Sequence, residues 1–117
     1  MARLIKIYYW GIDMSEKVKI WRSKISPTCR GAIFRAKRWF YATFYAKTST
    51  GDKEKSKENW ARLAREMVRV SNEEGVSDKA ARITIYYTDE GGTFNPIRAE
   101  IEVYEIKPVK TLEVKPE

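Results

Sequence analysis

Apolar and polar residues alternate in two segments near the start of the chain. In residues 3–10, isoleucine alternates with lysine and with aromatic side chains, and this period of two predicts a strand. Residues 17–23 repeat the pattern, with Val18 and Ile20 expected to face the core. Residues 12–16 form a link short enough for a hairpin, so we expect these two strands to pair.

A helical period marks the second half of the chain. Residues 53–74 predict an amphipathic helix that is capped by Asp52 and ended by Gly75. Residues 82–88 and 97–106 then predict two strands joined by a glycine-containing turn. The expected apolar face of the helix consists of Trp60, Leu63, Ala64, Met67 and Val68.

Residues 26–48 fit two different periods. Ser26 can cap a helix, and Pro27 suits its first turn. The residues that would share one helical face are Ile33, Ala36, Phe40 and Phe44. A period of two is equally regular, and the density of aromatic residues favours a strand. We predict a strand over residues 36–47 and leave residues 27–35 open between helix and strand.

Together these elements predict an α+β fold. We expect a mostly antiparallel sheet of four to five strands, packed against one main helix. The length of 117 residues suits one domain, which we expect to span residues 1–108. Residues 109–117 are expected to form a C-terminal tail, which is either frayed or an extra edge strand built on Leu112 and Val114.

Positive charge is concentrated in the first half of the chain. The first fifty residues hold eleven Lys and Arg residues, two acidic residues and ten of the fifteen aromatic residues. The formal net charge of the whole chain is +7, so the remainder is slightly acidic. Cations neutralise phosphates, and aromatic rings stack on bases that are not already stacked in a duplex. The composition therefore indicates a single-stranded nucleic acid as the partner.

The predicted strands would present these residues on one open face of the sheet. Within each strand a basic residue lies two positions from an aromatic one, so both project from the same face, about 7 Å apart. We expect bases to stack on Tyr8, Trp10, Trp21, Trp39, Tyr41 and Tyr45. We expect phosphates to contact Lys6, Lys17, Lys19, Arg35 and Lys37. The predicted function is non-enzymatic, largely sequence-independent binding of single-stranded DNA.

Three other interpretations of these residues stay open. In one, the aromatic rings pack in the core, under the helix that carries Trp60. In another, the face binds single-stranded RNA, because no residue pattern here reads or rejects a 2′-hydroxyl. In the third, the rings form a protein-docking face, including the interface of a homodimer, where Tyr, Trp and Arg are enriched.

The residue types that are missing limit the chemistry. The chain has no histidine, and Cys29 is its single cysteine, which excludes imidazole metal sites, His-based catalytic pairs and zinc clusters. It has no glycine-rich phosphate-binding motif, so we expect no cofactor and no metal. A nuclease needs converging carboxylates. No pattern brings Asp13 and Glu16 near the turn at Asp89, so we expect no enzyme activity.

The same composition bears on location. No apolar run is long enough to span a bilayer, and no charged-then-apolar leader is present. Together with the lone cysteine, this predicts a soluble, cytoplasmic protein with no membrane partner. Many Lys, Arg and Glu residues with few side-chain amides are a thermophile-like bias.

The run IKIYYW at residues 5–10, the basic and aromatic block at residues 35–45 and the order of elements resemble one known family. The chain is similar to the small archaeal single-stranded DNA-binding proteins called ThermoDBP, and in particular to their shorter ThermoDBP-related relatives. The resemblance covers nearly the whole chain and depends on architecture and composition, without a diagnostic motif. It implies an antiparallel sheet flanked by helices, and a cleft of aromatic and basic residues that holds single strands without strict sequence choice.

Overall fold

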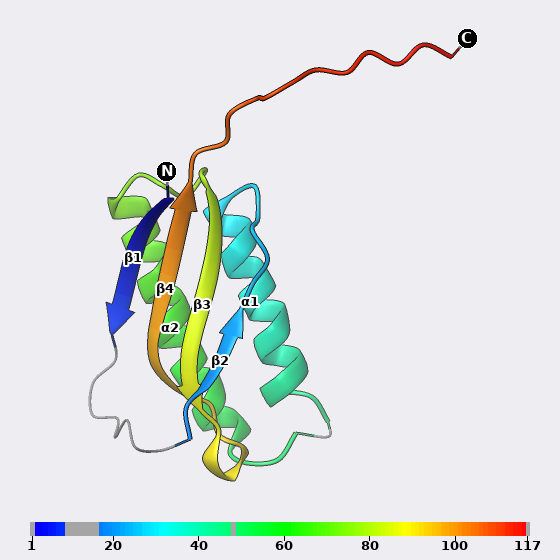
Figure 1. The fold of residues 1–117 in the computed structure, drawn as a ribbon. Helices are drawn as coiled ribbons and strands as arrows, with labels where there is room; N and C mark the ends of the chain where they lie inside the picture. The colour runs from blue at the N-terminus through cyan, green and yellow to red at the C-terminus, as the bar shows by residue number, and fades with distance from the viewer. Residues whose placement is uncertain (1, 9–16, 48, 117) are drawn as a thin grey trace.

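The computed structural model describes residues 2–8, 17–47 and 49–116. Its elements follow the order β-β-α-α-β-β (Figure 1). They are β1 (Ala2–Tyr8), β2 (Lys19–Arg22), α1 (Cys29–Phe44), α2 (Lys53–Glu73), β3 (Ala80–Thr88) and β4 (Asn95–Tyr104). The predicted α+β class with a four-stranded antiparallel sheet is confirmed, and the structure adds a second helix to the one that was expected.

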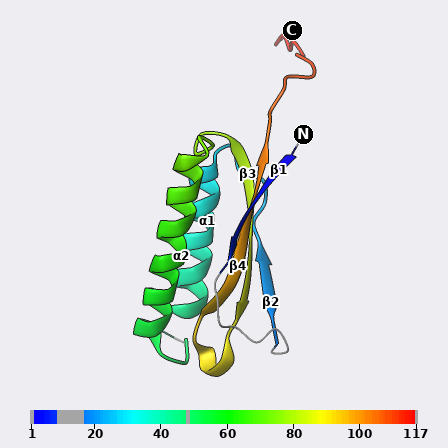
Figure 2. The same ribbon diagram turned by 90° about the vertical axis from the view of Figure 1, so that its left-hand side faces the viewer.

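The four strands form one antiparallel sheet in the order β1-β4-β3-β2. Both helices pack against the same face of this sheet, and no helix of the described chain covers the other face (Figure 2). Strands β3 and β4 form the predicted hairpin through a short 3₁₀ turn, where Gly91 and Gly92 have φ values of 64° and 80°. Glycine suits this turn because a positive φ costs it no steric strain.

The predicted pairing of the first two strands is wrong. Strands β1 and β2 lie at opposite edges of the sheet, with β4 and β3 between them (Figure 1). Strand β3 is buried at seven of its nine positions, which suits a central place, whereas Lys6 and Lys19 are exposed on the two edge strands. The predicted link at residues 12–16 lies outside the described residues.

The strand predicted over residues 36–47 is also wrong, because α1 occupies this part of the chain. Its buried face includes the side chains of the helical alternative: Ile33, Ala36, Phe40 and Phe44. Thr28 caps the helix in place of the predicted Ser26, and its Oγ1 accepts a hydrogen bond from the backbone N–H of Gly31 at 2.9 Å. Ser26 instead forms a β-bridge with Ala81 of β3.

Helix α2 confirms its prediction. The Asp52 carboxylate accepts a hydrogen bond from the Lys55 backbone N–H at 3.0 Å, so it caps the first turn. Gly75 follows the last turn with a φ of 68°. Of the predicted apolar face, Trp60, Leu63 and Met67 are buried and Ala64 is partly buried, whereas Val68 is 45% exposed, so its predicted place on this face is wrong.

Aromatic rings hold the two layers together. The Phe40 ring stacks on Trp60 with centroids 5.3 Å apart, and it meets the Phe94 ring edge-on, also at 5.3 Å. Phe94 precedes β4 and is fully buried. Its backbone N–H donates to Ser56 Oγ at 2.9 Å, and its carbonyl accepts from Asn59 Nδ2 at 2.7 Å. Two polar side chains of α2 therefore fix the approach of the hairpin to the helices.

Residues 105–116 follow β4 without helix or strand and run away from the two-layer body (Figure 1). No helix in the described part of the chain is both long enough and apolar enough to cross a membrane.

Candidate functional site

Helix α1 is unusual in its charge. It carries four cations, Arg30, Arg35, Lys37 and Arg38, and no Asp or Glu. All four cations are exposed, because the small and apolar residues of the helix take the face against the core. A helix with cations and no compensating carboxylates of its own presents a positive surface to solvent.

A groove of about 390 Å³ runs between α1 and α2. We call it the helix groove. The buried side chains of Ile33 and Trp60 are among its apolar lining residues. The ring of Phe34 also lines the groove and is 58% exposed, which is unusual for a phenylalanine. Its remaining lining residues include Arg30, Lys37, Tyr41 and Lys57.

Four of these residues form one stripe along α1. Arg30, Phe34, Lys37 and Tyr41 are separated by four, three and four positions, which places them on one side of a helix. Cation and ring alternate along the stripe. At a rise of 1.5 Å per residue, the Cα atoms of the two rings are about 10 Å apart along the helix axis.

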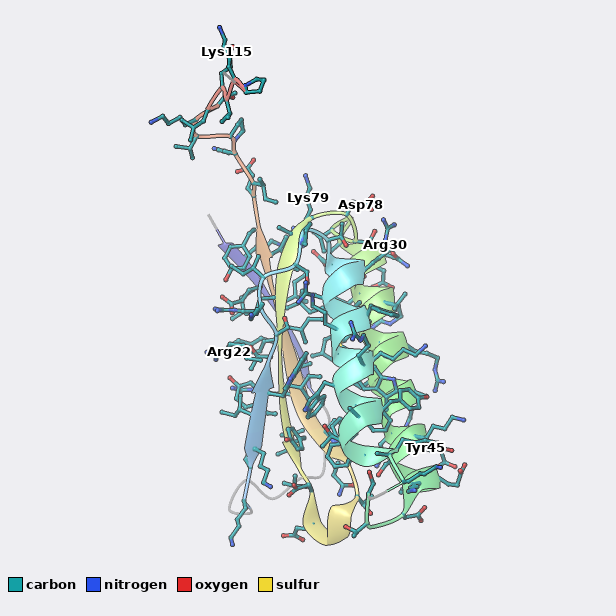
Figure 3. All side chains as sticks on the ribbon, turned by 90° about the vertical axis from the view of Figure 1, so that its right-hand side faces the viewer. Arg22, Arg30, Tyr45, Asp78, Lys79 and Lys115 are labelled. Carbon is teal, nitrogen blue, oxygen red and sulfur yellow. The ribbon has the colours of Figure 1, made fainter. Side chains whose placement is uncertain are left out.

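Tyr45 continues the stripe just past the end of α1 (Figure 3). Its ring lies 5.5 Å from the Tyr41 ring, and the Lys57 ammonium is 5.6 Å from the Tyr45 ring centroid. The Tyr45 hydroxyl donates to the Glu54 carboxylate at 3.1 Å. This end of the groove is therefore aromatic and held in place by residues of α2.

The charges of the helix groove are weakly compensated. Among the residues that line it, none is acidic. Arg30 forms an ion pair with Asp78 at 2.7 Å, but both side chains are largely exposed, so water and salt screen this pair strongly (Figure 3). Within the described residues, the ion pairs do not include Lys37 or Lys57.

A larger hollow, of about 640 Å³, lies along α2 beside Val68. Its lining includes Glu66 and Arg69, which form an ion pair with each other, and no aromatic residue. Volume alone would favour this hollow. It has no ring on which a base could stack, and Glu66 among its lining residues pairs with one of its two arginines, so the helix groove is the better candidate.

The open face of the sheet is the second basic and aromatic surface. We call it the open sheet face, and its described residues include Lys6, Arg22, Arg82, Tyr86, Arg98, Glu100, Glu102 and Tyr104. Figure 3 shows Arg22 on the side of the sheet away from the helices. In the register of the strands, Lys6 lies opposite Glu100, and Arg82 lies opposite Glu102. Residues directly opposite in an antiparallel pair share a face, so cations and carboxylates alternate across this surface.

Hydrogen bonds connect these charges. Arg82 forms an ion pair with Glu102 at 2.9 Å, and the Tyr104 hydroxyl also donates to Glu102 at 2.9 Å. Desolvation acts to raise the pKa of Glu102, but the hydrogen bonds from Arg82 and Tyr104 outweigh it and leave the pKa below its usual value.

A ring of the open sheet face is held in the same way. Arg98 lies over the Tyr86 ring at 4.0 Å, and the Tyr86 hydroxyl donates to Glu100 at 3.0 Å. One side of this ring is thus occupied by a side chain of the same protein.

The structure separates the residues that we expected on one face. Lys6 lies on the open sheet face, whereas Lys19 and Trp21 project from β2 toward the helix side, opposite Tyr87 and Ile85. Ile20, which was expected to face the core, is 58% exposed on the other side. The predicted phase of this strand is therefore wrong.

Trp21 and Trp39 form a stacked pair, with ring centroids 4.9 Å apart and planes at 15°. Trp39 also meets Phe44 and Phe94 edge-on, so it belongs largely to the core. Both indoles are partly buried. Trp39 therefore agrees with the interpretation in which the aromatic rings pack in the core. Trp21 stacks on Trp39 from β2, at the edge of the sheet.

The remaining predicted site residues lie apart from these. Lys17 is exposed and precedes β2, and Lys19 forms an ion pair with Asp89 at 2.7 Å. Arg35 and Lys37 are exposed on α1. The side chain of Tyr8 and the whole of Trp10 lie outside the described part of the structure.

Sequence reasoning assigned no site role to Phe34 or Lys57. Phe34 lies in residues 27–35, which were left open between helix and strand, and Lys57 lies on the helix predicted over residues 53–74. The signal for Phe34 is present in the helical period, because Phe34, Lys37 and Tyr41 recur at the spacing of one helix face.

Two residues with chemically reactive side chains, Cys29 and Asp52, have structural roles. Cys29 is buried, and desolvation raises the pKa of its thiol, with a smaller opposing effect from Ser71. Asp52 is a helix cap, as expected. Among the described residues, no group of three or more Cys, Asp and Glu side chains is arranged to hold a metal ion.

The fold and the groove define an α+β protein with a two-helix layer and a basic, aromatic groove in that layer. No protein-family model, curated protein or solved structure is detectably similar to the chain. The resemblance to the ThermoDBP family therefore stays a prediction.

Proposed function

We propose that this protein binds single-stranded DNA in the helix groove, without catalysis and with little sequence preference. The observation that carries the proposal is the stripe of alternating cation and ring on α1, in a groove that no acidic residue lines. Bases stack on Phe34 and Tyr41, and phosphates contact Lys37 and Lys57.

The chemistry of the groove supports a single strand in particular. An aromatic ring can accept a base face only where the base has left its neighbours, so a stacked duplex does not use such rings. Sequence readout in nucleic acids depends mostly on amides and forked donors that match base edges. None of the lining residues is Asn or Gln, and Arg30 is the one forked donor among them, so rings and ammonium groups make up most of the contacts and tolerate any base.

RNA is the second ligand that this groove accepts. No side-chain hydroxyl or amide other than the Tyr41 phenol lines it, so it contains little that would distinguish a 2′-hydroxyl. Competition between matched DNA and RNA oligomers measures the preference. We also propose a cytoplasmic location, supported by the single cysteine, which stays buried and unpaired with any other cysteine.

The test is the affinity of Phe34→Ala for a labelled dT oligomer, measured by fluorescence anisotropy at low salt. Loss of one stacked base should weaken binding by about 1–3 kcal/mol, which is roughly fivefold to 150-fold. The melting temperature should change little, because Phe34 is 58% exposed. Phe34→Tyr keeps a ring and should bind like the natural protein. Equal affinity of all three proteins would refute the proposed site.

A protein ligand is favoured by a different property of the same groove. Its floor is apolar and its rim is cationic, which also fits an acidic amphipathic helix. If dT oligomers fail to bind at low salt, the nucleic-acid proposal is wrong, and an acidic helical partner becomes the better explanation of the groove.

A further inference from the structure

The tail after β4 exposes a run of apolar side chains. Ile106, Val109, Leu112 and Val114 are 70%, 97%, 73% and 88% exposed. Other large apolar side chains of the described chain that reach the surface are only 45–58% exposed. Four apolar side chains held in water along twelve residues suit a segment that docks on another protein surface.

The tail has the composition of a short strand. Pro108 and Pro116 enclose the seven residues 109–115, and each of these seven has a backbone N–H that a proline lacks. We call residues 109–115 the tail segment. Leu112 and Val114 alternate with Glu113 and Lys115, and valine and threonine favour strands. As a strand, the segment would have one face more apolar than the other, where Leu112 and Val114 lie beside Lys110.

An edge of the sheet matches this segment in length. Strand β1 has seven residues and pairs with β4 on one side only, and no described strand pairs with its other side. Strand β2, at the opposite edge, has only four residues. Along β1, Leu4 is 48% exposed and Ile5 is partly buried, so a neighbouring strand would cover apolar surface on both faces. An uncovered edge presents backbone donors and acceptors that accept another strand.

We propose that this protein forms a homodimer in which the tail segment of each copy pairs with β1 of the other. The two sites are close together, because Tyr104 at the end of β4 pairs with Ala2 at the start of β1. Two copies that meet at this end of the sheet can exchange tails around a two-fold axis. The β1 edge of each copy is then paired, and no further copy can add.

A second copy fits better than the alternatives. Pairing with β1 of the same chain requires the tail to reverse within residues 105–108, whereas it runs away from the body (Figure 1). The tail segment does not favour a strongly charged partner, because its two lysines and one glutamate give it a net charge of only +1. Every copy carries both the segment and the edge, so the two are always present at equal concentration.

The test is the mass of the full-length protein in solution, measured by light scattering over a range of concentrations without nucleic acid. We expect a dimer. Leu112→Lys combined with Val114→Lys removes the apolar face and should raise the dimer Kd at least tenfold. The matched control is Thr111→Lys, which adds charge to the other face of the segment and should stay dimeric.

Hydrogen exchange provides the second readout. Amides of residues 109–115 should be protected in the natural protein and should lose that protection in the double variant. A monomer at every concentration would overturn the proposal, and so would a dimer whose residues 109–115 exchange freely. Because no nucleic acid is present, these outcomes are independent of the proposed function.

Discussion

The helix groove and the open sheet face contain similar residues, yet they differ in how their charges are satisfied. Both surfaces combine cations with aromatic rings. On the open sheet face, Arg82 forms an ion pair with Glu102, and Lys6 lies opposite Glu100 in the strand register. In the helix groove, no lining residue is acidic, and the Phe34 ring is exposed.

This difference shows that the number of cations on a surface does not measure its capacity to bind phosphate. A cation that already contacts a carboxylate must give up that contact before it binds an anion. A ring such as Tyr86, with a guanidinium over one face, has less surface left for a base than Phe34 has. Lys37, Lys57 and the Phe34 ring of the groove are therefore more available to a ligand than Arg82, Arg98 and the Tyr86 ring of the sheet.

The largest expected effect comes from removing two cations from each surface in turn. Lys37→Ala combined with Lys57→Ala should weaken binding of a dT oligomer at least about a hundredfold at low salt, because a hydrogen bond to a charged group contributes about 1.5–3 kcal/mol. Lys6→Ala combined with Arg22→Ala removes the same charge from the open sheet face and should change affinity less than about threefold. Anisotropy titrations of both variants measure the difference. If the second double variant weakens binding more than the first, the binding site lies on the open sheet face and the proposal is wrong.

A smaller effect is expected in the salt dependence of binding. Two phosphate contacts, from Lys37 and Lys57, predict that log K falls with log salt at a slope of about −1.4, since each contact contributes about −0.7 for a single strand. Lys57→Ala should reduce the steepness by about 0.7. Lys55→Ala, which removes the same charge from an exposed position on the same helix outside the groove, is the control. An equal change in both variants would mean that the charge acts at long range and not through contact.

The two surfaces also differ in how far the sequence could predict them. Helix α2 and the β3–β4 hairpin were predicted because each has one period only. In α1, Ala36, Phe40 and Phe44 are spaced by four, which satisfies a period of two and comes close to a period of 3.6. Aromatic strand propensity then favoured the wrong alternative, since such propensity depends on the surroundings.

The phase of β2 needed information that is not local. Ile20 and Trp21 are both large and apolar, and the choice of which one faces the helices depends on Trp39, whose ring stacks on Trp21. The order of the strands could not be predicted for a similar reason. The short link between the first two strands suggests a hairpin, whereas the burial of β3 places that strand in the centre of the sheet. The sequence alone shows that the first fifty residues are rich in cations. Where these cations lie in space became clear only once α1 was known to be a helix.

The smallest expected effect tests whether the carboxylates of the open sheet face neutralise its cations. The pKa of Glu102 is held below its usual value in the folded state, so its ion pair stabilises the fold above the unfolded pKa, about 4.3, and this contribution disappears as pH falls through the folded value. At pH 7, Glu102→Gln should lower stability by less than about 1 kcal/mol, because the pair is partly exposed. The difference in stability between the two proteins should narrow as pH falls below the unfolded pKa and disappear once Glu102 is protonated in the folded state. Thermal melts from pH 7 to pH 3 measure it.

The same variant relates that ion pair to binding. Glu102→Gln releases Arg82 from its partner and makes the open sheet face more positive. If the helix groove holds the strand, the affinity for a dT oligomer should stay within about threefold of the natural protein, because long-range attraction is mostly screened beyond about 10 Å at 0.1 M salt. A rise of tenfold or more would contradict the comparison, since it would mean that the sheet binds phosphates as soon as its carboxylates are removed.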